Sequence, residues 1–153
     1  MFTSSLILKA PKESEIRAKH QQIPSNTVLL EKIIDYFKND YFKFEKFASE
    51  LVISMDNHFL FETTRSTKDG GHNAIGTYNI GLSSTNNVLP CFLEVKCYSL
   101  NNSVGVKETP RLIFRMENGD FSISVTTSFI AKQACKKIIE DRHKVIIISG
   151  IDI

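Results

Sequence analysis

The chain has 153 residues and a net charge of +2, from 19 basic and 17 acidic residues, and 42% of its residues are hydrophobic. This length favours one domain with a core of its own, and the composition excludes collagenous, low-complexity and disordered proteins. The charge balance gives no argument for nucleic acid by itself, so any DNA affinity would need a local basic patch.

The three cysteines, Cys91, Cys97 and Cys135, fit neither a disulfide framework nor a CxxC metal pattern. We therefore expect free thiols and a reducing, cytoplasmic setting. No apolar run approaches the roughly 18 residues of a membrane helix, and the first residues lack the pattern of a signal peptide.

The first part of the chain predicts helices. Residues 1–24 are expected to form an N-terminal arm, to which no role is assigned, and residues 25–153 to form the domain. Hydrophobic residues at helical spacing predict two helices, or one kinked helix, on either side of Asn39-Asp40. They are Leu29, Ile33 and Phe37, followed by Phe44, Phe47, Ala48, Leu51 and Met55.

Three strands are expected next. Aromatic residues and threonines predict a strand over residues 58–65, and a second strand over 74–80 follows the turn signal Asp69-Gly70-Gly71. The polar cluster at 83–87 is typical of a loop. The apolar run over 91–98 predicts the third strand.

The last part of the chain predicts helices and strands in alternation. A short helix is expected between Thr109, as its cap, and Gly119, as its stop. Alternation over residues 121–126 predicts a strand with one buried face, and residues 145–148 lack alternation, which suits a parallel strand covered on both faces. Ser128 is expected to cap a helix between these strands. The apolar stripe of that helix is Ile130, Ala131, Ala134 and Ile138.

The expected fold class is therefore α/β, with a mixed central sheet flanked by helices in the order α-β-β-β-α-β-α-β. The chain stops at Ile151-Asp152-Ile153 without a turn or a closing helix. We accordingly expect a module that is truncated at its C-terminus.

Glu94-Val95-Lys96 lies within the apolar run 89–98, where a buried strand would favour neither an acid nor an amine. Residues at i and i+2 of a strand project from the same face, so the carboxylate and the ammonium are expected to lie side by side. Burying two charges is unfavourable unless they pair, bind a metal or take part in chemistry. The alternative is an ion pair at a solvated strand edge, which contributes little.

The neighbouring strand opens with the acidic turn at Asp69, followed by His72 and Asn73. Such a turn and an acid-x-Lys strand can converge on one divalent ion. Mg²⁺ prefers hard oxygen ligands and is usually held by one or two carboxylates, waters and phosphate oxygens. Glu94 is then a ligand, and Lys96 positions the attacking water or handles its proton. This arrangement is typical of phosphodiester hydrolysis.

These residues resemble the PD-(D/E)xK nucleases, and within them the catalytic domain of Mrr-like restriction endonucleases. The likeness runs from about residue 41 to the end of the chain, in the right order. It rests on the helix Phe44–Leu51, the DGGxD-like turn Asp69–Asn73, the (E/Q)xK-like strand Leu93–Tyr98, and the TTS-like segment Val125–Ser128 followed by Gln133-Ala134.

The resemblance implies a restriction-endonuclease-like fold and a Mg²⁺-dependent endonuclease that hydrolyses double-stranded DNA. Cutting both strands needs two active sites, so a homodimer is expected. Asn73 departs from the family, where the second acid of DGGxD normally binds the metal. Three interpretations stay open: Asp69 supplies the carboxylate, the chain has lost activity, or a weaker site suffices. The alternative function is therefore an impaired module of the same fold that binds DNA or protein.

Other polar residues have weaker signals. Glu45 is either a solvated charge on its helix or a residue that supports the metal site. Lys107, Arg111 and Arg115 are spaced four apart and form either a basic stripe that binds phosphates or an ordinary solvated face. His72 is assigned no role. A buried free cysteine is mostly an apolar filler, which is the interpretation favoured for Cys97.

Overall fold

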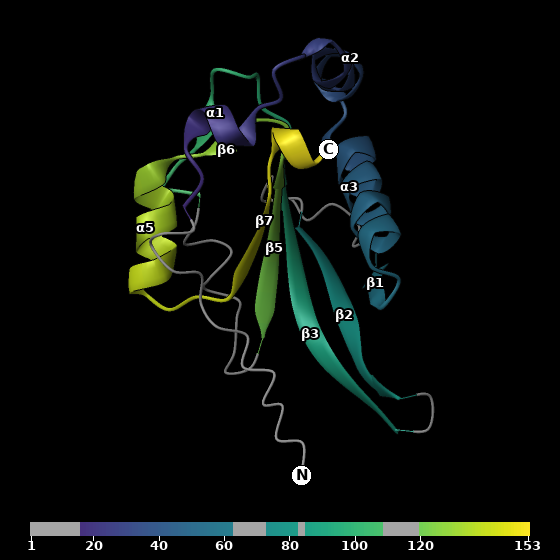
Figure 1. Ribbon diagram of the computed structural model, residues 1–153. Coiled ribbons are helices and arrows are strands. Elements are labelled where there is room, and N and C mark those ends of the chain that lie inside the picture. The colour runs from purple at the N-terminus through teal and green to yellow at the C-terminus, as the bar shows by residue number, and fades with distance from the viewer. Residues whose placement is uncertain (1–15, 63–72, 83–84, 109–119) are drawn as a thin grey trace.

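The computed structural model describes residues 16–62, 73–82, 85–108 and 120–153. Its centre is a five-stranded mixed sheet of order β1-β2-β3-β5-β7, as Figure 1 shows. β1 and β2 pair antiparallel, as do β2 and β3, whereas β3, β5 and β7 are parallel. The strands are β1 (Phe59–Glu62), β2 (Asn73–Leu82), β3 (Thr85–Lys96), β5 (Phe121–Thr126) and β7 (Val145–Ile148). The predicted α/β class with a mixed sheet is confirmed.

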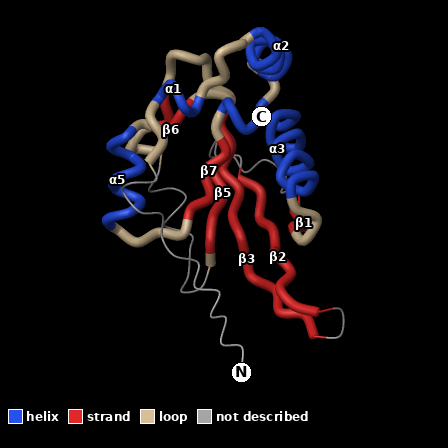
Figure 2. Tube along the Cα trace, viewed as in Figure 1, coloured by secondary structure: helices blue, strands red, loops and turns tan. Residues whose placement is uncertain are grey.

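Helices lie on both sides of this sheet, with α3 on one side and α5 on the other (Figures 1 and 2). The helices are α1 (Lys19–Gln22), α2 (Val28–Phe37), α3 (Tyr41–Met55), α5 (Lys132–Glu140) and the 3₁₀ turn η2 (Gly150–Asp152). The prediction of two helices around Asn39-Asp40 is confirmed as α2 and α3. Asp40 is the N-cap of α3, and its carboxylate accepts a hydrogen bond from the Lys43 amide at 3.0 Å.

The two faces of the sheet pack against different partners. On the α3 side, Leu93, Ile123 and Val125 are fully buried together with Phe44 and Ala48. On the other side, the core consists of α5 residues packed on β7 and on a small parallel sheet of β4 (Ser103–Val104) and β6 (Phe129–Ile130). This arrangement gives three layers, with α3 and α5 as the outer ones.

The burial of two strands differs from the prediction. All six residues of β5 are buried, so the expectation of one buried face is wrong. β5 lies between β3 and β7, and both of its faces are covered. The parallel strand over 145–148 is confirmed as β7, but cover on both faces is wrong, because Ile146 is 41% exposed. β7 is an edge strand of the sheet.

Two local predictions also fail. Residues 85–87 belong to β3 rather than to a loop, because the β2–β3 hairpin keeps its pairing out to Leu82 and Thr85. Ser128 does not cap α5. The cap position is Ala131, and the Ser128 hydroxyl donates a hydrogen bond to the Asn102 carbonyl instead. The helix expected between Thr109 and Gly119 falls outside the described residues.

One glycine is required where β1 meets β2. Gly76 pairs with Phe61 in the register. A Cβ at Gly76 would come within 2.6 Å of the Leu60 carbonyl oxygen, which lies in the backbone and cannot move aside cheaply. A side chain at this position would therefore separate the two strands.

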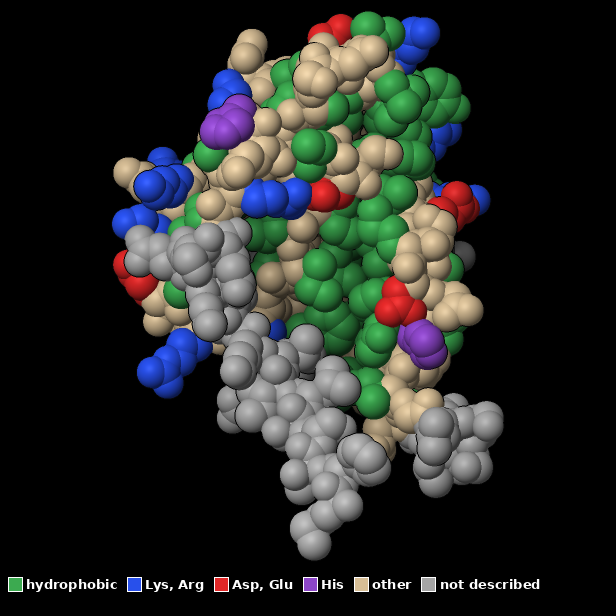
Figure 3. Space-filling model, viewed as in Figure 1, with side chains coloured by type: hydrophobic (Ala, Val, Ile, Leu, Met, Phe, Trp, Pro, Cys, Tyr) green, Lys and Arg blue, Asp and Glu red, His purple; other side chains and the backbone are tan. Residues whose placement is uncertain are grey.

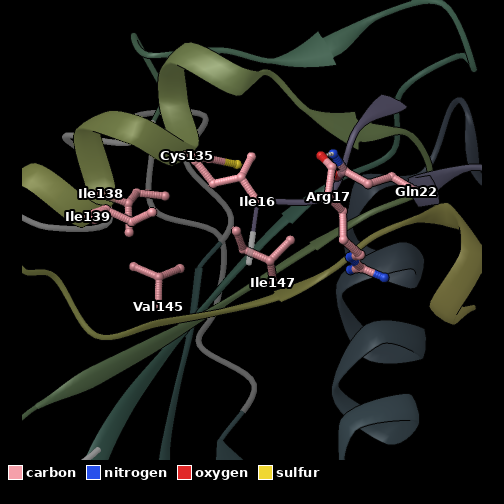
Figure 4. Close-up of a pocket in the computed structure, with 8 residues that line it drawn as sticks. All are labelled: Ile16, Arg17, Gln22, Cys135, Ile138, Ile139, Val145 and Ile147. Atoms are coloured by element: carbon pink, nitrogen blue, oxygen red, sulfur yellow. Dashed lines mark hydrogen bonds between the residues drawn. The ribbon is translucent and has the colours of Figure 1, made fainter. Parts of the chain in front are cut away.

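Residues 17–22 pack against the end of the chain. The Gln22 side chain accepts from the Ile130 amide at 2.9 Å and donates to the Ile130 carbonyl at 3.2 Å. Arg17 donates two hydrogen bonds to Asp152, at 2.7 and 3.0 Å. A cavity of about 250 Å³ lies between this segment, α5 and β7, and Figure 4 shows its mostly apolar lining. Across the part of the chain that the structure describes, no helix has both the length and the apolar character needed to cross a membrane.

Candidate active site

Glu94 and Lys96 form an ion pair on β3, with 3.2 Å between Lys96 Nζ and Glu94 Oε1. Their positions alternate with Leu93 and Val95, which belong to the core under α3, so the pair projects from the opposite face of the sheet. Glu94 is only 4% exposed, and the Lys96 side chain is 22% exposed. The alternative of a solvated ion pair is therefore wrong for the carboxylate.

The sheet register places polar residues on both sides of Glu94. Asn73, the first residue of β2, is its partner across the β2–β3 hairpin, and Ser124 is its partner on β5. Asp69 and His72 fall outside the described residues. Of the segment predicted to lie beside the acid-x-Lys strand, the structure therefore describes only Asn73, which pairs with Glu94.

A second carboxylate was not predicted from the sequence. Glu108 and Glu94 line the same small cavity, of about 10 Å³, together with Ser124 and apolar residues of β6, α5 and β7. A cavity of that size holds at most one water. The Glu108 carboxylate accepts a hydrogen bond from the Gly105 amide at 2.9 Å. This bond stabilises the turn over residues 105–108. Only the Gly-x-x-Glu spacing of the turn signals this contact in the sequence.

Glu45 lies in α3 and is 2% exposed. The interpretation as a solvated helix charge is therefore wrong, because this part of α3 packs against the sheet rather than facing water. The Ser49 hydroxyl donates a hydrogen bond to the backbone carbonyl oxygen of Glu45 at 3.0 Å, four residues earlier in α3. A supporting role for the Glu45 carboxylate stays a prediction.

Of the three predicted basic residues, Lys107 is exposed in the turn after β4, whereas Arg111 and Arg115 are outside the described residues. Within the described ranges, the structure does not bring three His, Cys, Asp or Glu side chains together in the manner of a metal cluster. Among the described residues, the site around Glu94 comprises the carboxylates of Glu94 and Glu108 and the amine of Lys96.

All three cysteines are free thiols, as predicted. Burial raises the pKa of Cys91 to about 12. Burial also raises the pKa of Cys97, although a hydrogen bond with Thr127 acts in the opposite direction. A thiol with a raised pKa is a poor nucleophile at neutral pH, which agrees with the interpretation of Cys97 as a structural residue.

The segment after β5 fixes the end of β3. The Thr127 hydroxyl accepts from the Tyr98 amide at 2.8 Å and donates to the Tyr98 carbonyl at 2.7 Å. The Thr127 amide donates to the Lys96 carbonyl at 3.3 Å. Because Thr127 is fully buried, these bonds hold the backbone that carries Lys96 in a fixed position. The TTS-like segment therefore has a clear structural role beside the ion pair.

Comparisons with known proteins agree with this geometry. A family model described as a restriction endonuclease, Mrr_cat, matches residues 37–153. A solved structure described as the DNA modification-dependent restriction endonuclease AspBHI is 36% identical, with a TM-score of 0.84. The match covers 94% of this chain and 38% of that one. No curated protein matches the chain.

A second solved structure is described as the MspJI restriction endonuclease in complex with a 27-mer oligonucleotide. It is 22% identical, with a TM-score of 0.81, and the match covers 90% of this chain and 33% of that one. At this identity the likeness shows the fold. The match therefore spans only about a third of the length of each structure. It belongs to the Mrr-like restriction endonuclease family of the PD-(D/E)xK superfamily.

Proposed function

We propose that this chain is a catalytic domain that hydrolyses phosphodiester bonds of double-stranded DNA with the help of Mg²⁺. The observation that carries the proposal is the Glu94–Lys96 pair on β3, whose carboxylate is buried, in a member of a restriction endonuclease family. The AspBHI chain is described as dependent on DNA modification. We extend only the cleavage of DNA to this chain.

The energetics of the pair favour a functional explanation. Taking a carboxylate out of water costs several kcal/mol, and the attraction to one amine offsets this cost only in part. An apolar residue at position 94 would avoid the cost entirely. A buried acid beside an amine is therefore better explained by a ligand that needs both groups than by stability.

The residues fit a magnesium ion by their donor chemistry. Glu94 offers a carboxylate, and its partner Asn73 or the preceding acid Asp69 would offer a second oxygen. Mg²⁺ needs few protein ligands, because waters and substrate phosphates complete its octahedron. When bound, the ion would polarise the phosphoryl group and lower the pKa of a coordinated water.

Lys96 has two tasks in this proposal. Its ammonium donates a hydrogen bond to the attacking water and offsets the negative charge that develops on the phosphate. Its distance of 3.2 Å from Glu94 already places it beside the carboxylate. The role predicted for Glu45 as a supporting residue is retained, although α3 covers the sheet face opposite to the one from which Glu94 and Lys96 project. Lys107, Arg111 and Arg115 would bind the DNA backbone.

A second candidate function is an impaired module that binds DNA without cutting it. Asn73 favours this alternative, since an amide oxygen brings no charge to a cation. A site with Asn73 and Glu94 as its only protein ligands would hold Mg²⁺ weakly.

A plasmid-nicking assay with Mg²⁺ or Mn²⁺ tests the proposal. The unchanged chain should nick DNA, EDTA should stop it, and Lys96→Ala should lower the rate by about 10²-fold or more. Lys46→Ala is the matched control, because Lys46 forms an exposed pair with Glu50 on α3 and its loss removes the same charge.

Asn73→Asp separates the two candidate functions. Cleavage that begins only in this variant would identify an impaired site. Absence of cleavage in every variant, together with salt-sensitive retention of DNA, would leave the binding module as the function. Equal rates in Lys96→Ala and Lys46→Ala would exclude the proposed role of Lys96.

A further inference from the structure

A cavity of about 320 Å³ lies beside the end of α3. This volume is in the range of cavities that hold small ligands, about 300–1,000 Å³. Figure 3 shows a hydrophobic area on this side of the molecule, with an acidic and a histidine side chain together at its border. We call it the α3-end cavity, and the residues of its lining that matter here are Asp56, His58, Phe59, Tyr78 and Phe121.

The α3-end cavity is separate from the candidate active site. Leu89 also lines it and packs with the core under α3, whereas Glu94 projects from the opposite face of the sheet. The two residues are five positions apart on β3, which corresponds to about 17 Å along the strand. A ligand in this cavity would therefore not contact the Glu94–Lys96 pair.

Asp56 brings a fixed negative charge to the cavity. Its Oδ1 accepts a hydrogen bond from the His58 amide at 3.0 Å and lies 2.7 Å from His58 Nδ1. Its Oδ2 accepts a hydrogen bond from the Tyr78 hydroxyl at 2.9 Å. These bonds, those from His58 before that from Tyr78, hold the pKa of Asp56 below its ordinary value, so the carboxylate is ionised at neutral pH. Whether His58 is neutral or protonated, its pair with Asp56 has no net positive charge.

The end of α3 adds to the negative potential at the cavity. The C-terminal end of a helix carries a partial negative charge, which basic side chains usually offset. The last turn of α3 contains no basic residue, and the residue at its C-cap is the acid Asp56. No lysine or arginine occurs among the described residues that line the cavity. The lining therefore favours a cation and disfavours a ligand that carries a phosphate.

Three aromatic rings in contact with one another form the apolar wall. The ring centroids of Phe59 and Tyr78 are 4.6 Å apart, and each lies 6.1 Å from the centroid of Phe121. The rings are inclined to one another by 57–83°, so they do not form the parallel slot that a flat nucleobase would need. Inclined rings suit a rounded ligand, and aromatic faces attract cations within about 6 Å.

We propose that the α3-end cavity binds a small organic cation, an ammonium group that carries methyl or other short alkyl substituents. The charge lies beside Asp56 and the end of α3, and the alkyl groups contact Phe59, Tyr78 and Phe121. Aromatic walls with a nearby acid are a common means of binding quaternary ammonium groups. The inference does not depend on DNA cleavage, because binding is measured without DNA.

Titration of the 153-residue chain with choline, followed by the amide resonances of a nitrogen-labelled sample, is the direct test. Choline should shift the resonances of residues around the cavity, with a dissociation constant on the order of 1 mM. The matched ligand is the neutral alcohol in which carbon replaces the nitrogen of choline. It has the same shape without the charge and should bind at least about fivefold more weakly.

Asp56→Asn tests the negative charge. Asparagine keeps a side-chain acceptor for the turn to His58 but carries no charge. Choline should bind at least about fivefold more weakly to this variant, while the affinity for the neutral alcohol stays unchanged. Asp35→Asn is the matched control, because Asp35 is an exposed acid on α2, outside the cavity. It should leave choline binding unchanged.

Tyr78→Leu tests the aromatic wall. It keeps an apolar side chain but removes the ring, so it should weaken the binding of choline more than that of the neutral alcohol. Tyr78→Phe also removes the hydrogen bond to Asp56 but keeps the ring, and it should weaken choline binding less than Tyr78→Leu. Circular dichroism verifies that each variant is folded.

The comparison of the two ligands on the unchanged chain needs no variant, so it decides the matter even where a substitution impairs folding. No binding of choline at about 10 mM, or equal affinity for choline and the neutral alcohol, would overturn the proposal. Choline binding that Asp56→Asn leaves unchanged, an equal loss in Asp35→Asn, or resonance shifts confined to residues outside the cavity would overturn it as well.

Discussion

The two faces of the central sheet are built from the same strands but differ in chemistry. Under α3, Leu93, Ile123 and Val125 are fully buried among apolar side chains. Glu94 and Ser124 are buried as well. Each is the next residue along its strand after Leu93 or Ile123, so both lie on the opposite face. The two faces therefore do not differ in whether these residues are buried. They differ in whether the buried side chains are apolar or polar.

This difference teaches which face stabilises the fold. Burying a leucine or isoleucine contributes about 1.5–3 kcal/mol, and the α3 face buries several. Burying a carboxylate or an unpaired hydroxyl lowers stability by about 1–3 kcal/mol or more. We infer that the α3 face holds the domain together and that the opposite face retains its polar residues for function.

The largest effect is expected from the α3 face. Leu93→Ala should lower the free energy of unfolding by about 2–5 kcal/mol, because it leaves a cavity in a fully buried core. Urea denaturation measures this change. Leu60→Ala, at an exposed leucine on β1, is the control and should stay within about 0.5 kcal/mol of the parent. Similar losses at both sites would show that the α3 face is not the stabilising one.

The charged face should respond in the opposite direction. Replacing both members of the buried pair, as Glu94→Leu with Lys96→Met, should raise the free energy of unfolding by about 1–4 kcal/mol while DNA cleavage is lost. The same denaturation and nicking assays measure both outcomes.

The single variant Glu94→Leu is the control for this change. It leaves Lys96 without its carboxylate, so it should be less stable than the double variant. A double variant that is less stable than the parent would mean that the pair is structural, and the contrast between the faces would fail.

Elements with strong local patterns could be predicted from the sequence. The spacing of Phe44, Ala48 and Leu51 specifies a helix by itself, and the alternation over 121–126 specifies a strand. The mistakes about burial concern what covers each element. The burial of both faces of β5, and the exposure of Ile146 on β7, depend on sheet order, which local periodicity does not contain.

The candidate site also contains residues that a local sequence pattern predicts and residues that only the folded chain reveals. Glu94 and Lys96 could be predicted because two charges interrupt an apolar run, and this anomaly is local. Glu108 lies 14 positions after Glu94 in a polar turn, and only the folded chain brings it to the same cavity. The burial of Glu45 likewise depends on how α3 lies on the sheet.

A smaller gain is expected from Ser122, on the same face as Glu94. Its hydroxyl is fully buried and has no hydrogen-bond partner among the described residues. Ser122→Ala should raise the free energy of unfolding by about 1 kcal/mol, because it removes an unsatisfied polar group. Ser128→Ala is the control, since the Ser128 hydroxyl donates to the Asn102 carbonyl and its loss should be destabilising. Equal effects at the two serines would contradict this account of the polar face.

The smallest effect is expected from the ion pair between Arg17 and Asp152, which joins residues 17–22 to the last residues of the chain. Burial alone would raise the pKa of Asp152, but hydrogen bonds from Arg17 and Ser149 outweigh it and hold the pKa below its usual value. A carboxylate with a lowered pKa stabilises the fold above its unfolded pKa, and this contribution is lost as the pH falls through the folded value. The Arg17–Asp152 contribution should therefore be fully present at pH 7, begin to fall near the unfolded pKa of about 4, and be lost only as the pH falls through the lowered folded pKa.

Arg17→Met keeps most of the apolar stem and removes the charge. Because both side chains are about one-third exposed, the expected loss at pH 7 is only about 0.5–1 kcal/mol. The thermal stabilities of parent and variant, compared between pH 7 and 3, should approach each other toward the acidic end, where the parent begins to lose the same interaction. Lys46→Met, which removes an exposed pair, should run parallel to the parent throughout. If the stability of Arg17→Met also stays at a constant distance from that of the parent over this pH range, the docking of residues 17–22 depends on the Gln22 hydrogen bonds and on apolar contact. Apolar contact would then stabilise this segment as it stabilises the α3 face.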